Sequence, residues 1–143
     1  MNVMDELAKA ENKKILESGV IDTDKQPFVM VYNTFILNNN YTVNQKMVFL
    51  ALKSFGGNKN NCYPSKETLA QKLSLSKRTV ATVLKQLEEL GAILIINRYA
   101  ESNRKTSNIY ILASIDINTG KFVSNSLDIH RPLKQIGIKV QGK

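Results

Sequence analysis

The feature that most constrains the fold is a pair of apolar helical stripes separated by a very short turn. The first stripe, Leu69, Ala70 and Leu73, lies on a short helix that we expect to begin after an N-cap at Ser65. A second helix is expected to begin at Ser76. Its apolar residues recur at helical spacing: Val80, Val83, Leu84, Leu87 and Leu90. Two helices joined by a turn of roughly three to four residues form a single supersecondary unit.

Several elements are expected before this pair. Residues 4–18 carry a weak apolar stripe that predicts a helix, and residues 19–27 are typical of a linker. Residues 28–32 are rich in β-forming side chains and predict a strand. Thr42 and Gln45 fit a capping box at the start of another helix. The apolar residues of that helix that share one face are Val43, Met47, Leu50 and Ala51.

The hydrophobic period changes after the second helix of the pair. Residues 93–96 and 109–112 are short apolar runs rich in β-branched side chains, and a polar stretch separates them. Two strands joined by a polar loop predict a hairpin. Residues 113–143 form a basic tail with scattered apolar positions, in which residues 121–123 predict one more strand.

The segment LAQKLSLSKRTVATVL, from Leu69 to Leu84, resembles a bacterial helix-turn-helix. It has the small Ala70 where the two helices cross, and Leu75 in the turn between them. Many relatives have glycine where this chain has Ser74, which indicates a left-handed backbone at that position. Such a unit places its second helix in the major groove of duplex DNA.

A longer span, residues 28–112, resembles the winged helix domains of phage and plasmid replication initiators and regulators from low-GC bacteria. The shared segments are CYPSKETLAQKL, LSKRTVATVLKQLEELGAI and TSNIYIL. The resemblance implies an α+β fold, mainly helical, in which a C-terminal β-hairpin is the wing of a winged helix-turn-helix. We therefore expect a helical extension and linker at residues 1–27, the winged helix domain at 28–112 and a basic tail at 113–143.

The charge distribution favours a nucleic acid partner. Residues 1–26 carry four Lys against six acidic residues, whereas residues 27–143 carry sixteen Lys and Arg against six acidic residues. A basic body attracts a polyanion through many salt-sensitive contacts, although basic charge also serves solubility. Asn, Lys, Ile and Tyr, whose codons are A/T-rich, account for 49 of 143 residues and indicate a low-GC bacterial or phage genome.

Seven polar residues of the second helix lie off its apolar stripe and are the candidates for DNA contact. They are Ser76, Lys77, Arg78, Thr79, Thr82, Lys85 and Gln86. Basic and hydroxyl side chains gather at the helix N-terminus, where backbone N–H groups also favour phosphate. Arg78 suits a bidentate contact to guanine, and Thr79 or Thr82 suits a thymine methyl group or a phosphate. The alternative is an ordinary solvated helix face.

The loop of the hairpin supplies the second candidate surface. Its polar and basic residues are Arg98, Asn103, Arg104, Lys105, Thr106 and Ser107. A basic wing can lie along phosphates or enter a minor groove. The alternative is a polar loop with no ligand.

We expect neither catalysis nor a bound cofactor or metal ion. Cys62 and His130, the single residues of their kinds, cannot build an ordinary zinc site. Packing at the entry of the following helix is the favoured role for Cys62, and no glycine-rich phosphate loop is present. One cysteine suits a reducing cytoplasm, and no apolar run is long enough for a membrane span.

These observations predict a site-specific double-stranded DNA-binding protein of a mobile element. It would act in replication initiation, transfer or transcriptional control. The alternative is a winged-helix interaction module in a replication complex, without base readout. We also expect residues 1–26 to assist formation of a homodimer, because two-fold dimers engage two matching half-sites.

Overall fold

The computed structural model describes residues 3–6, 9, 27–57, 59–99, 107–136 and 138–139. The α-helices are α2 (Asn33–Ile36), α3 (Val43–Gly56), α4 (Lys66–Leu73), α5 (Lys77–Glu89) and α6 (Arg131–Ile136), with a 3₁₀-helix η1 (Ser124–His130). The strands are β1 (Asn61–Cys62), β2 (Ile93–Ile96), β3 (Arg98–Tyr99), β4 (Ile109–Leu112), β5 (Ser114–Ile115), β6 (Phe122–Val123) and β7 (Ile138–Lys139). Residues 3–6 and 9 are helical, and the rest of the helix expected at 4–18 lies outside the described residues.

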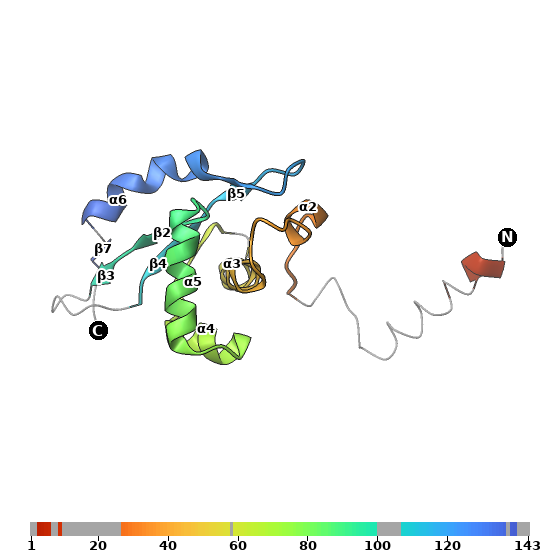
Figure 1. The fold of residues 1–143 in the computed structure, drawn as a ribbon, viewed down its shortest axis with the longest axis horizontal. Coiled ribbons are helices and arrows are strands. Elements are labelled where there is room, and N and C mark those ends of the chain that lie inside the picture. Colours follow the sequence, from red (N-terminus) through yellow and green to blue (C-terminus); the bar gives the residue numbers. More distant parts are fainter. Residues whose placement is uncertain are drawn as a thin grey trace.

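Helices α3, α4 and α5 begin where the sequence predicts, because each has its own side-chain cap. Thr42 accepts a hydrogen bond from the backbone of Gln45, and the Gln45 side chain accepts one from Thr42, which completes the expected capping box. Ser65 and Ser76 cap α4 and α5 in the same manner, by accepting from the backbone N–H three residues on. Figure 1 shows α3 and α5 near the strands β2 and β4, with α4 at the end of α5 away from β2.

The buried face of α3 differs from the apolar stripe identified in the sequence. Val48, Phe49 and Leu52 are the buried residues, whereas Val43 is 74% exposed and Met47 45% exposed. This helix has apolar residues on more than one face, and helical periodicity alone does not choose between them. The larger surface of Phe49 packs against an aromatic cluster formed by distant segments.

The expected hairpin is confirmed as β2 and β4, which pair antiparallel with Ile93 opposite Leu112 and Ile96 opposite Ile109. β1 adds to the other side of β4, which gives the sheet order β1-β4-β2. The two faces of this sheet bury different clusters. Tyr110 and Leu112 pack with the helices α3, α4 and α5, whereas Ile96 and Ile111 pack with Leu127 of η1.

The prediction of a strand at residues 28–32 is wrong. The segment is irregular, and the side chains of Phe28 and Met30 lie exposed. Its backbone has no neighbouring strand to pair with among the described residues; instead the Lys53 ammonium donates a hydrogen bond to the carbonyl oxygen of Met30 at 2.7 Å. β-forming side chains favour a strand only where a sheet edge is within reach.

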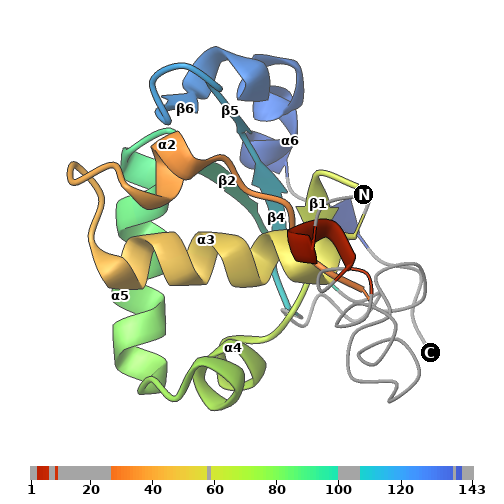
Figure 2. The ribbon, with the colours of Figure 1, turned by 90° about the vertical axis from the view of Figure 1, so that its right-hand side faces the viewer.

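Residues 113–136, which the sequence analysis set apart as part of a basic tail, pack onto the domain. The strand predicted at 121–123 is confirmed as β6, which pairs with β5. Phe122 contacts the rings of Phe35, Tyr41 and Phe49, with centroids 4.7–5.4 Å apart. This packing places η1, α6 and the β5–β6 pair at the end of the molecule opposite α4 (Figure 2).

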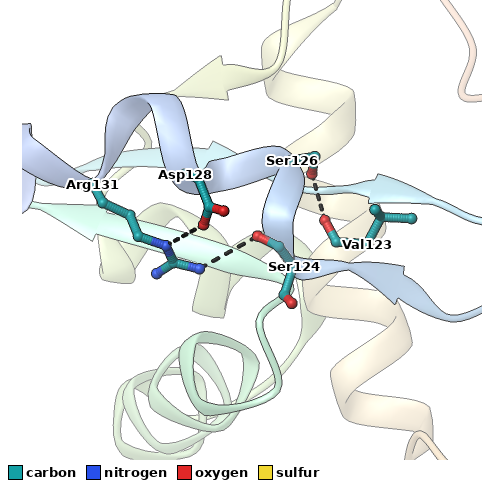
Figure 3. Close-up of polar contacts among 5 residues, drawn as sticks. All are labelled: Val123, Ser124, Ser126, Asp128 and Arg131. Atoms are coloured by element: carbon teal, nitrogen blue, oxygen red, sulfur yellow. Dashed lines mark hydrogen bonds and ion pairs between the residues drawn. The ribbon is translucent and has the colours of Figure 1, made fainter.

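The 3₁₀-helix η1 is held by polar contacts of its own (Figure 3). Arg131 donates to the Asp128 carboxylate at 2.7 Å and to the carbonyl oxygen of Ser124 at 3.3 Å. Ser126 donates to the carbonyl oxygen of Val123.

Of the helices in the described residues, none has the length and apolar character that crossing a membrane requires.

Candidate nucleic-acid interface

The turn between α4 and α5 is built on a left-handed residue. Ser74 has φ 57° and ψ 40°, as the comparison of this position with glycine predicts. The reversal lets the backbone N–H of Leu75 donate to the carbonyl oxygen of Ala70 at 3.0 Å. Ser76 then begins α5 directly, so the chain leaves α4 and enters α5 within three residues.

α5 separates its buried and exposed sides cleanly. Val80, Val83, Leu84 and Leu87 are buried, as the sequence predicts. On the opposite side, Arg78, Thr82 and Lys85 are exposed. They lie at positions i, i+4 and i+7, which places them on one helical face. Within the described part of the chain these three side chains make no hydrogen bond or ion pair with the protein, so their polar groups are available to a ligand.

The other four candidates on α5 already have partners in the protein. The Ser76 hydroxyl donates to that of Thr79 at 2.8 Å while it caps the helix. Lys77 forms an ion pair with Glu67 of α4 at 2.5 Å. The side chain of Gln86 is half-buried and accepts a hydrogen bond from Gln45 of α3 at 3.1 Å. Ser76, Thr79 and Gln86 therefore help to begin or hold α5, and Lys77 joins α5 to α4 through an exposed ion pair.

The C-terminal end of α5 is directed toward the sheet. Glu88 accepts a hydrogen bond from the backbone N–H of Ile95 and forms an ion pair with Lys134 of α6. Its charge is thus matched at the end of the helix farthest from Arg78. Glu89 is exposed. Arg78, near the N-terminal end of α5, therefore lies at the opposite end of the helix from Glu88 and Glu89.

The first candidate residue of the wing is engaged by the protein. The Arg98 guanidinium lies 4.7 Å from the centre of the Tyr63 ring, a cation–π contact. Arg98 and Tyr99 form β3, which pairs in parallel with β7, a pairing that the sequence analysis did not expect. Ser107 is half-buried and lies two residues before the start of β4. Asn103, Arg104, Lys105 and Thr106 lie outside the described residues.

The family comparison agrees with this geometry. A family model for a helix-turn-helix domain matches residues 42–93, from the cap of α3 to the first residue of β2. The chain contains a helix-turn-helix domain. With the antiparallel β2–β4 hairpin after α5, the expected mixed α+β winged helix fold is confirmed. No curated protein and no solved structure matches the chain.

The helix-turn-helix domain also contains a shallow hollow that the sequence analysis missed. It has a volume of about 330 Å³ and lies between the N-terminal ends of α4 and α5 and the start of β4. Its polar lining includes Lys66, Glu67, Lys77, Ser107 and Asn108. The Ser65 cap and the charged residues on either side of the turn were visible in the sequence, but only the crossing of the helices brings Glu67 to Lys77.

Cys62 has the packing role that the sequence favours. Its side chain is 3% exposed in the core beneath the helices, and burial raises the pKa of the thiol to about 12. Burial likewise raises the pKa of the neighbouring Tyr110. Among the described residues, no group of three His, Cys, Asp or Glu side chains is arranged to hold a metal ion.

Proposed function

We propose that this protein binds specific sites on duplex DNA by placing α5 in the major groove. The observation that carries the proposal is the exposed stripe of Arg78, Thr82 and Lys85, opposite the buried side of a helix-turn-helix. Arg78 supplies the bidentate donor that reads guanine, and Thr82 suits a thymine methyl group. The major groove is about 12 Å wide and admits one helix with its side chains.

The wider charge distribution supports the same partner. The net charge of residues 27–143 is strongly positive, whereas residues 1–26 are mildly acidic. Two cationic side chains of α5, Arg78 and Lys85, lie on the presented face. Contacts to phosphates position the protein, and contacts to base edges then select the sequence. Arg104 and Lys105 of the wing are proposed to contribute phosphate contacts.

The proposed biological role is that of a mobile-element protein, in a plasmid, a phage or a conjugative element. The resemblance of residues 28–112 to replication initiators and regulators supports replication initiation, transfer or transcriptional control. The protein would act in the cytoplasm without a catalytic residue or cofactor. We also propose a homodimer assisted by residues 1–26, which sedimentation of the full chain against a chain that begins at Gln26 would test.

The deciding experiment is selection from random duplexes followed by a salt titration of the selected site. If about five phosphates are neutralised, the slope of log affinity against log salt is expected to lie near −4 to −5. The variant Arg78→Ala/Lys85→Ala should lose the enriched sequence. The variant Lys59→Ala/Lys121→Ala removes the same charge from exposed positions outside α5 and should retain it.

Two outcomes would contradict the proposal. If the selection enriched no sequence, the protein would not recognise specific bases. If the affinity did not change with salt concentration, DNA would not be the partner. The alternative role as an interaction module in a replication complex would then be favoured.

A further inference from the structure

Glu67 and Lys77 join the two helices of the helix-turn-helix at their N-terminal ends. Glu67 lies in the first turn of α4 and Lys77 is the first residue of α5. The carboxylate and the ammonium group are 2.5 Å apart, and the two side chains are 65% and 61% exposed. An ion pair this exposed contributes little to the stability of a fold. Its main effect is on the charge that α5 presents.

The carboxylate of Glu67 stays ionised at neutral pH. The hydrogen bond from Lys77, together with the Glu67 backbone and the charges of Lys77 and Lys66, holds the pKa of this carboxyl below its usual value. An anion is therefore fixed beside the first cation of α5. In the absence of DNA, the ammonium group of Lys77 is paired with this carboxylate.

The same carboxylate lines the hollow between α4 and α5. Lys66, Lys77 and the N-terminal end of α4 also face this hollow, and each of them favours an anion. Glu67 is the group there that opposes one. A phosphate that pairs with Lys77 displaces the Glu67 carboxylate, which then lies in water without its partner.

We infer that Glu67 is an internal competitor of the DNA phosphate for Lys77. The inference rests on the proposed function, because it requires that the N-terminal end of α5 meets the DNA backbone. The free protein pairs Lys77 with Glu67, and the bound protein pairs Lys77 with a phosphate. Glu67 thereby lowers the affinity for duplex DNA.

The test compares Glu67→Gln with the unaltered chain on a random-sequence duplex, across a range of salt concentrations. Glu67→Gln should bind about 1.4- to fivefold more tightly, the range that exposed ion pairs typically give. Its salt slope should differ from that of the unaltered chain by less than about 0.9, because Lys77 contacts a phosphate in both proteins. Lys77→Gln should weaken binding, and Glu67→Gln/Lys77→Gln should bind no better than Lys77→Gln.

Glu89→Gln is the matched control. It removes the same charge from an exposed position on the far end of α5. The inference would be overturned, and the proposed function left standing, if Glu67→Gln changed the affinity no more than Glu89→Gln does. The same holds if Glu67→Gln bound DNA more weakly than the unaltered chain. Absence of salt-sensitive duplex binding by the unaltered chain would overturn the proposed function and, with it, this inference.

Discussion

The carboxylate of Glu88 and the ammonium group of Lys134 lie 2.9 Å apart although 46 residues separate them in the sequence. Together they engage both backbone groups of Ile95 in β2. The N–H of Ile95 donates to Glu88 at 2.8 Å, and its carbonyl oxygen accepts from Lys134 at 2.6 Å. This arrangement covers an edge of β2 that another strand could otherwise pair with, and it fastens α5 to α6.

Replacing Glu88 by alanine should destabilise the fold by about 1–3 kcal/mol. The half-buried Ile95 N–H would lose its acceptor, and the exposed Lys134 would lose its counter-charge. Urea unfolding measures the change. Glu89→Ala removes a neighbouring, exposed carboxylate and should change the free energy of unfolding by less than about 0.5 kcal/mol. Equal losses in the two variants would show that the contacts to Ile95 contribute nothing.

Replacing Arg78 by alanine should weaken binding to the selected site more than binding to random duplex. A bidentate contact to a base contributes about 1–3 kcal/mol of discrimination, whereas a phosphate contact contributes equally on every sequence. Competition titrations with both duplexes measure the ratio. Arg104→Ala/Lys105→Ala should reduce both affinities alike. The same uniform loss in Arg78→Ala would mean that Arg78 contacts only the backbone.

Replacing Ser74 by glycine should stabilise the protein by up to about 1 kcal/mol. Ser74 holds a left-handed backbone, φ 57°, in which a Cβ atom costs about 1–2 kcal/mol. Part of that gain is offset because glycine makes the unfolded chain more flexible. Thermal unfolding is the measurement. Ser74→Ala keeps the Cβ and should give no gain; an increase as large as that of glycine would refute backbone strain as the cause.

Replacing Gly120 by alanine should destabilise the protein by about 2 kcal/mol or more. Gly120 has φ 71°, and a Cβ atom there would lie 2.1 Å from the carbonyl oxygen of Thr34 at α2. Gly57→Ala is the control, because its φ is 60° but nothing lies within 4 Å of the added atom. The difference between the two variants in chemical denaturation isolates the close approach of α2 to the β5–β6 turn. If the two variants lost the same free energy of unfolding, the whole cost would come from the backbone conformation.

The folded protein should protect Cys62 from thiol reagents until it unfolds. Its pKa of about 12 means that the buried thiol carries its proton near pH 8, where an exposed cysteine is partly ionised. Because the unfolded thiol titrates first, near its ordinary value of 9.0, the stability due to this group is present below pH 9 and falls as pH rises toward 12.

Two measurements check the prediction for Cys62. Reaction with a disulfide reagent at pH 8 should follow the unfolding rate. The decline in stability above about pH 9 should be smaller in Cys62→Ala, in which only other groups such as Tyr110 still contribute. Rapid labelling of the native protein would contradict the burial.

The helices of the helix-turn-helix were predictable because their signals are local. Ser65 and Ser76 each cap a helix through the N–H three residues on, and this bond depends on no other part of the chain. The buried side of α5 was equally readable, since its apolar residues occupy a single face. In α3 the prediction was right only in part, because Leu50 and Ala51 pack against the core whereas Val43 and Met47 are exposed.

The sequence by itself determined the elements whose signals lie within a few residues, namely the capped helices and the short turn. It also showed the two apolar runs that pair as the β2–β4 hairpin. Tertiary structure alone decided which distant groups meet. The pairing of Lys77 with Glu67, of Lys134 with Glu88 and of β7 with β3 depends on how the helices cross and where the chain returns. Periodicity carries no information about such contacts, because each one forms only after burial of the core has set the relative positions of the elements.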